Sequence, residues 1–167
     1  SMTQRECSII AGSLLGDGYI ERNGRGFRFQ VLHSYAQRAY VEWKYQELRS
    51  VRAGPPVVLA LADRRVRKSY LGVRFRTKNI PLFKDFYTYC YRERKKTISR
   101  AWLEMVRDPL ALAVWFMDDG GRRRDCRGMF LNTLSFSREE HGVLQAHLRD
   151  VFGIETRLHW VQDGFRL

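Results

Sequence analysis

The chain has 167 residues, of which 44% are hydrophobic and 13% aromatic, a composition that excludes a disordered chain and suffices for one large core or two small ones. Lysine and arginine total 30 against 18 acidic residues, and the resulting net charge of +12 favours a polyanionic partner, with nucleic acid ahead of an anionic membrane surface. No apolar stretch approaches the roughly 20 residues that cross a bilayer, and no signal peptide is recognisable, so we expect an intracellular protein with no membrane partner.

The first expected element is a helix that begins at a capping box. Thr3 and Glu6 have the capping-box spacing, and the apolar stretch after them ends at Asp17-Gly18. Apolar and polar residues then alternate over "GFRFQVLHS", residues 26–34, which predicts a strand. A helix rich in aromatic residues follows, two strands over 57–63 and 70–78 flank a basic loop, and a helix over about 81–91 comes last.

A second set of elements repeats this order. Asp108 and Pro109 provide an N-cap and a first-turn proline for an apolar helix that ends at Asp119-Gly120. We expect a strand over 128–136, a helix from a capping box at Ser137 to Gly153, and two short strands in "TRLHWVQ" and "GFRL". The chain then stops, so the second copy lacks the closing helix.

The two apolar helices belong to an internal repeat. The stretches "IAGSLLGDG", residues 10–18, and "LAVWFMDDG", residues 112–120, align at an offset of 102 residues, which places Asp17 on Asp119. The same offset places Gln30 on Asn132 without a gap. The repeat predicts two related halves, 1–95 and 108–167, joined by a basic and partly helical linker over 96–107.

The repeated Asp-Gly pairs suggest a metal site. Gly12 and Gly16 lie on one face of the first helix, so a second helix can approach closely and bring Asp17 beside Asp119. Two carboxylates at helix C-termini are unfavourable because of the helix dipole and their mutual repulsion, and a divalent cation relieves both effects. Oxygen ligands of this kind suit Mg²⁺ completed by substrate phosphates. The alternative is that each Asp-Gly pair is only a helix end and a turn.

Basic and amide side chains on the strands and loops predict contact with DNA. A two-stranded ribbon fits the major groove, where arginine, glutamine and asparagine read base edges, and other basic residues contact phosphates. The candidate DNA-binding residues are Arg22, Arg25, Arg28, Gln30, His33, Arg64, Arg65, Arg67, Lys68, Arg74, Arg76, Lys78, Arg122, Arg123, Arg124, Arg127, Asn132, Ser135, Arg157, His159 and Gln162.

The segments "LLGDGYI", "KKTI", "LAVWFMDDGG" and "LNTLSFS" resemble, in order along essentially the whole chain, the LAGLIDADG homing endonuclease family in its single-chain, two-motif form. The resemblance implies an α+β fold of two pseudo-twofold-related αββαββα halves with saddle-shaped antiparallel sheets, the second half being truncated here. It also implies a monomeric, site-specific endonuclease that hydrolyses both strands of a long double-stranded DNA target and leaves 3′ overhangs.

The same resemblance implies roles for particular residues. The Asp17 and Asp119 carboxylates would bind Mg²⁺, or Mn²⁺ or Ca²⁺ in its place, and Gly16 and Asp118 would offer backbone carbonyls. Lys96 would assist the attacking water electrostatically. Gln30, with Asn132 as its repeat partner, would organise water in the active site. The alternatives are an RNA-splicing maturase or a catalytically silent DNA-binding protein of this fold, and a basic structural protein.

Overall fold

The computed structural model describes the whole chain apart from residues 64–67, 125 and 162–163, and apart from the side chains of residues 63 and 68. Its N-terminal elements are α1 (Gln4–Leu15), β1 (Tyr19–Asn23), β2 (Gly26–Ser34), the 3₁₀ turn η1 (Tyr35–Gln37), α2 (Arg38–Glu47), β3 (Val57–Asp63), β4 (Lys68–Arg76) and α3 (Leu82–Cys90). The elements that follow are β5 (Tyr91–Arg92), β6 (Lys95–Lys96), α4 (Arg100–Glu104), α5 (Pro109–Asp119), β7 (Gly120–Arg122), β8 (Met129–Leu131), α6 (Arg138–Phe152), β9 (His159–Val161) and β10 (Gly164–Arg166). Within the described residues, no helix is long and apolar enough to cross a membrane.

The helix boundaries follow the capping residues that the sequence predicts. The capping boxes at Thr3 and Ser137 both form, and the Asp108 carboxylate accepts a hydrogen bond from the Ala111 amide at 3.0 Å. Gly153 ends α6 in the left-handed conformation with φ of 67°. These side chains and this glycine satisfy backbone groups that a helix end leaves unpaired, and the three predicted helix starts are confirmed.

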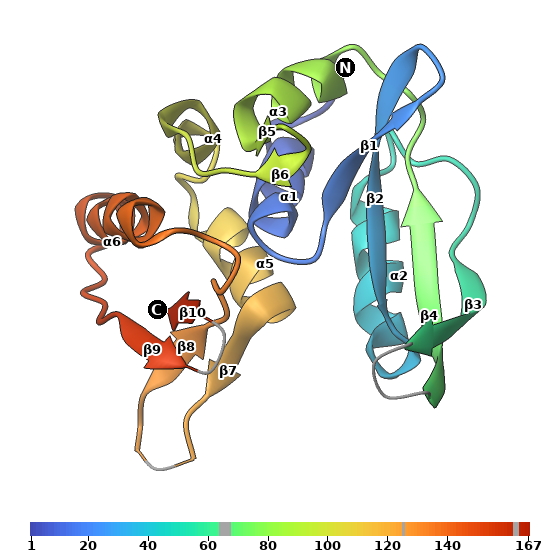
Figure 1. Cartoon of the computed structure of the whole chain (residues 1–167). Helices are drawn as coiled ribbons and strands as arrows, with labels where there is room; N and C mark the ends of the chain where they lie inside the picture. Colours follow the sequence, from blue (N-terminus) through green and yellow to red (C-terminus); the bar gives the residue numbers. More distant parts are fainter. Residues whose placement is uncertain (64–67, 125, 162–163) are drawn as a thin grey trace.

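The N-terminal part is an antiparallel sheet with strand order β1-β2-β4-β3, packed against α2 and α3 (Figure 1). Strands β2 and β3 have the predicted bounds, and β4 begins and ends two residues before the predicted strand over 70–78. Strand β1 is not predicted, because its sequence "YIERN" has too few apolar residues to alternate. It forms through a tight hairpin in which Asn23 pairs with Gly26 and Gly24 has φ of 60°.

The C-terminal part contains two separate antiparallel ribbons, β7-β8 and β9-β10, beside α6 (Figure 1). The predicted strand over 128–136 is wrong beyond Leu131, where β8 ends and the chain soon enters a local turn. The Leu131 amide donates to the Leu167 carbonyl at 2.7 Å, and the Asn132 amide donates to the Asp119 carbonyl at 2.9 Å. The Phe136 amide donates to Thr133 in a local turn. This backbone path attaches the segment to α5.

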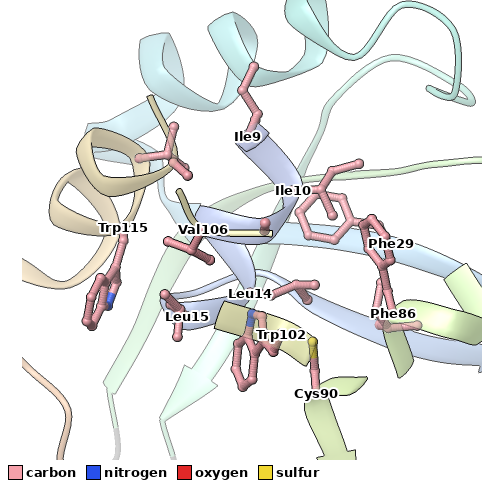
Figure 2. Packing of buried hydrophobic residues seen from close by; sticks show 14 of the residues in the cluster. Ile9, Ile10, Leu14, Leu15, Phe29, Phe86, Cys90, Trp102, Val106 and Trp115 are labelled. Carbon is pink, nitrogen blue, oxygen red and sulfur yellow. The ribbon is translucent and has the colours of Figure 1, made fainter. Parts of the chain in front are cut away.

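Helices α1 and α5 pack side by side at the centre of the molecule, between the four-stranded sheet and the C-terminal ribbons (Figure 1). A Cβ atom at Gly12 would overlap the backbone carbonyl of Ala111, and one at Gly16 would overlap the Asp118 side chain. Figure 2 shows the core around this contact, in which α1 meets residues from the sheet, α3, α4 and α5: Ile9, Ile10, Leu14, Leu15, Phe29, Phe86, Cys90, Trp102, Val106 and Trp115. The close approach predicted from Gly12 and Gly16 is therefore present.

The segment 96–107 packs into this core. It contains α4, and Trp102 and Val106 are fully buried against residues of α1 and α3 (Figure 2). Its assignment as a linker between two halves stays a prediction.

Gly12→Ala should reduce the free energy of unfolding by about 1–3 kcal/mol, because overlap with the Ala111 backbone outweighs the better helix propensity of alanine. The matched control is Gly142→Ala in α6, where a Cβ meets no atom within 4 Å and should add up to ~1 kcal/mol. Urea unfolding of both variants measures the difference. Equal stabilisation of the two variants would contradict the packing of α1 on α5.

Candidate active site

The C-terminal ends of α1 and α5 meet and bring Asp17 and Asp119 to one place. Helix α1 ends at Leu15 with Gly16 as its C-cap, whereas α5 continues through Asp119. The Gly18 amide returns to the Ser13 carbonyl at 2.8 Å, which turns the chain directly after Asp17. The Asp17 side chain is 42% exposed, so one acid of the pair faces solvent.

Asp119 has the strongest electrostatic perturbation among the acids here. Its pKa is raised to about 7, mainly by burial and then by the neighbouring carboxylates of Asp17 and Asp118, while Lys96 acts in the opposite direction. The repulsion by Asp17 and Asp118 adds to the larger effect of burial. This is the repulsion expected for two acids at adjacent helix ends.

Lys96, at the end of β6, binds the backbone on both sides of Asp17. Its Nζ donates to the Gly16 carbonyl and to the Gly18 carbonyl, each at 2.7 Å. Burial lowers the pKa of Lys96 to about 8, although the charges of Asp119 and Asp17 oppose this shift. The ammonium group therefore lies beside the acid pair and fixes the turn that presents Asp17.

The Asp118 carboxylate is fully buried and is held by the N-terminal part of the chain. It accepts from Lys44 Nζ at 2.6 Å and from the Tyr40 hydroxyl at 2.9 Å, and its second oxygen lies 3.3 Å from the Asp17 amide. Since its side chain has no exposure, the part of Asp118 that reaches solvent is backbone. The backbone role expected for Asp118 stays a prediction, and the carboxylate has contacts that the sequence did not predict.

Lys44 is a functional candidate that the sequence reading missed. It is completely buried, burial lowers its pKa, and the Asp118 charge opposes that shift. Burial and the same carboxylate raise the pKa of the Tyr40 phenol. Its place in the sequence could have identified it. Lys44 follows Tyr40 by four residues and Val41 by three, so it lies on the apolar face of α2.

Gln30 and His33, two of the predicted DNA-binding residues, are buried in β2. His33 Nδ1 lies 3.2 Å from an Asp17 carboxylate oxygen. The Gln30 side chain accepts from Arg76 Nε at 2.6 Å and donates to the Tyr19 hydroxyl. His33 thus belongs to the acid cluster, and Gln30 is held within the sheet; their proposed contacts with water and DNA stay predictions.

Asn132 lies beside the other acid. The residue is exposed, and its backbone amide donates to the backbone carbonyl of Asp119. The repeat partners Gln30 and Asn132 therefore differ in burial.

Arg28, Arg74 and Arg76, three of the predicted DNA-binding residues, lie on one face of the sheet together with Glu21, which was not expected there. The register pairs Glu21 with Arg28 and Gln30 with Arg76, so these four side chains share a face. Glu21 lies 2.5 Å from Arg28 and 3.2 Å from Arg76. Half-buried Arg74 continues this face, and Arg22, Arg25 and Lys78 are exposed.

Several predicted DNA-binding residues of the C-terminal part line one groove of about 570 Å³, which contains Arg123, Arg127, Arg157 and His159 together with Arg166. Arg122, Arg124 and Ser135 are exposed. Outside the described residues lie Arg64, Arg65, Arg67 and Gln162, and the side chain of Lys68 is likewise not described. Four of the predicted DNA-binding residues therefore lie together in this groove.

The donor atoms at the helix ends fit a hard divalent cation. Asp17 and Asp119 offer carboxylates, and the Gly16 carbonyl keeps a second lone pair beside the bond from Lys96. The described residues contain no group of three or more His, Cys, Asp and Glu side chains that could hold a metal ion. A cation here would take its remaining ligands from water and substrate oxygens, which is the coordination that Mg²⁺ prefers.

Comparison with known proteins identifies relatives over nearly the whole chain. Residues 7–167 match a family model described as the LAGLIDADG DNA endonuclease family. DNA endonuclease I-ChuI of Chlamydomonas applanata is 30% identical over 98% of this chain and 81% of its own length. Protein RecA of Mycolicibacterium chitae is 28% identical over 94% of this chain, which spans 38% of that protein. The structure of homing endonuclease I-WcaI bound to its DNA recognition sequence matches with a TM-score of 0.87 at 22% identity, covering 99% of this chain and 75% of that one.

The raised pKa of Asp119 predicts how stability changes with pH. A carboxyl with a folded-state pKa near 7 favours the folded state fully below its ordinary pKa of about 3.9, and this contribution is lost as pH rises through 7. In EDTA, Asp119→Asn should therefore become more stable relative to the parent as pH increases from 5 to 7.5. Urea unfolding at both pH values gives the difference. A constant difference would show that Asp119 titrates at its ordinary pKa.

Proposed function

The chain belongs to the LAGLIDADG DNA endonuclease family, and we propose that it is a monomeric, site-specific homing endonuclease that hydrolyses both strands of a long double-stranded DNA target and leaves 3′ overhangs. One observation carries the proposal: close packing of the two repeat helices brings Asp17 and Asp119 together beside Lys96, where burial and the neighbouring carboxylates raise the pKa of Asp119. If each Asp-Gly pair were only a helix end and a turn, the two acids would not need to lie together beside a lysine.

The repeat supports an architecture of two unequal halves in one chain. At the offset of 102 residues, α1 corresponds to α5, β2 to β8 and α2 to the middle of α6. The two acids are repeat partners and lie at the central helix pair. We infer that the pseudo-twofold axis passes between α1 and α5, so that each acid serves one scissile phosphate.

In this proposal the acids and the lysine have separate tasks. Asp17 and Asp119 hold Mg²⁺ with help from the Gly16 and Asp118 carbonyls, and the bound ion supplies Lewis-acid activation of the phosphodiester and of water. Lys96 fixes the carbonyls around Asp17 and contributes positive charge where the attacking water becomes anionic.

The basic face of the sheet and the C-terminal groove provide the DNA surface. Arg28 and Arg76 are held by Glu21, which orients their guanidinium groups before DNA binds. The groove with Arg123, Arg127 and Arg157 is suited to phosphate oxygens. With a net charge of +12, affinity should fall steeply with salt.

Asp17→Asn and Asp119→Asn should each reduce cleavage by about 100-fold or more, because each removes a charged ligand at the reacting phosphate. DNA affinity should stay within a few fold of the parent. The experiment incubates the protein and both variants with a randomised-site plasmid library in Mg²⁺, with EDTA as the metal-free control, and then measures rates on the selected site.

Two outcomes would count against the proposal. Parental cleavage by Asp119→Asn would overturn the assignment of the site. A parent protein that binds RNA tightly and cuts no DNA in the library would support a maturase instead.

Lys96→Met should lower the cleavage rate by about 100-fold, because it removes the only charge that bridges the Gly16 and Gly18 carbonyls among the described residues. Lys95→Met is the matched control: Lys95 is the adjacent residue of β6, is exposed, and carries the same charge. Single-turnover rates at saturating protein separate the two, and equal losses would indicate a general effect of net charge on DNA binding.

A further inference from the structure

The Asp118 carboxylate joins three helices at the candidate active site. One oxygen, Oδ1, accepts from Lys44 and Tyr40 of α2, and the other, Oδ2, faces the Asp17 amide directly after α1. Asp118 itself belongs to α5. The Tyr40 hydroxyl also lies 3.2 Å from the Val114 carbonyl of α5. Through this one side chain, α2 is connected to the backbone of the metal-site acid at the end of α1.

This arrangement exists on one side of the repeat. At the offset of 102 residues, Asp118 corresponds to Gly16, Lys44 to Ala146 and Tyr40 to Gly142. Gly16 leaves the space that the Asp118 side chain occupies, since a Cβ there would overlap the Asp118 Cβ. Asp17 therefore has an anchor for which the residues at the repeat-related positions offer no counterpart.

Stability alone is a poor reason for such a buried pair. The Lys44 and Asp118 side chains have no exposed surface. Burying both charges costs much of what their attraction returns, and apolar residues of similar size often stabilise a protein as well or better. What a polar pair adds is direction: it fixes where the second carboxylate oxygen points, and that oxygen faces the Asp17 amide.

We propose that Asp118 is a positioning residue: its buried carboxylate, which accepts from Lys44 and Tyr40, fixes the backbone of Asp17 at the metal-binding end of α1. The effect on cleavage rests on the function proposed above, whereas the anchor itself does not. Displacement of a reacting group by about 1 Å can cost 100-fold in rate, so a modest change in this backbone is enough to slow the reaction.

Two matched double variants isolate the anchor from the ion pair. Lys44→Met/Asp118→Asn and Lys44→Met/Asp118→Leu both remove the two buried charges and have side chains of similar size at residue 118. Only the asparagine keeps an oxygen that can accept from the Asp17 amide. Thermal unfolding should give similar midpoints for the two proteins, which shows that any other difference is local.

The first readout is hydrogen exchange of the Asp17 amide, followed by NMR on the free protein. Exchange should be at least tenfold faster in the leucine variant than in the asparagine variant. The second readout is the single-turnover cleavage rate at saturating protein, which should be at least tenfold lower in the leucine variant at equal DNA affinity. A role confined to stability would move neither readout between two equally stable proteins.

Equal exchange at Asp17 in the two variants, or equal cleavage by them, would overturn the inference. If the leucine variant does not fold, Tyr40→Phe replaces it: loss of one donor to Asp118 should speed Asp17 exchange at least threefold, and unchanged exchange would overturn the inference. If the parent protein cuts no DNA, the proposed function fails, and the exchange measurements alone decide whether Asp118 anchors Asp17.

Discussion

The approach of α1 to α5 at Gly12 and Gly16 determines the geometry of the whole site. Gly12 has only hydrogen in place of a side chain, so the backbone of α1 can pack directly against the Ala111 carbonyl of α5. At Gly16 the same absence of a side chain admits Asp118. Because both helices end at this contact, Asp119 at the end of α5 and Asp17 just after α1 must lie near each other. The acid pair is a consequence of helix packing.

This packing creates an electrostatic demand that the chain meets only in part. Three carboxylates stand at two adjacent helix C-termini, where the helix dipoles also disfavour negative charge. Asp118 is neutralised internally by Lys44, and Lys96 binds the carbonyls beside Asp17. Asp119 is left with a pKa near 7. A divalent cation beside the acid pair would relieve the carboxylate repulsion that contributes to this shift.

The parts that local sequence determines could be predicted, and the parts that tertiary contacts determine could not. Thr3, Asp108 and Ser137 signal helix starts through capping chemistry that acts within one turn. The close helix contact could be predicted because two glycines four residues apart leave one face of the helix without side chains. Strand β1 was not, since its pairing depends on a hairpin rather than on its own apolar residues.

The candidate site divides in the same way. Asp17 and Asp119 were predicted because the repeat marks them, and the roles of the Gly16 and Asp118 carbonyls were expected from the family resemblance. Lys44 and Glu21 were missed because their partners, Asp118 and Arg76, are distant in sequence. A lysine on the apolar face of α2 indicates a buried partner without saying which one. Only the folded chain pairs it with an acid from another helix.

The unequal residues at Gly16 and Asp118 bear on why two copies of the repeat occur in one chain. Because each occupies the space beside the other, a carboxylate at both positions would not fit, and glycine at both would leave Lys44 and the Asp17 amide without this acceptor. In a dimer of two identical subunits, the positions of Gly16 and Asp118 would carry the same residue. A single chain carries a different residue in each copy, so it can combine the close helix contact with a buried carboxylate. Sterics therefore limit this helix contact to one such carboxylate, and the hydrogen bonds to Lys44 and the Asp17 amide depend on that one being present.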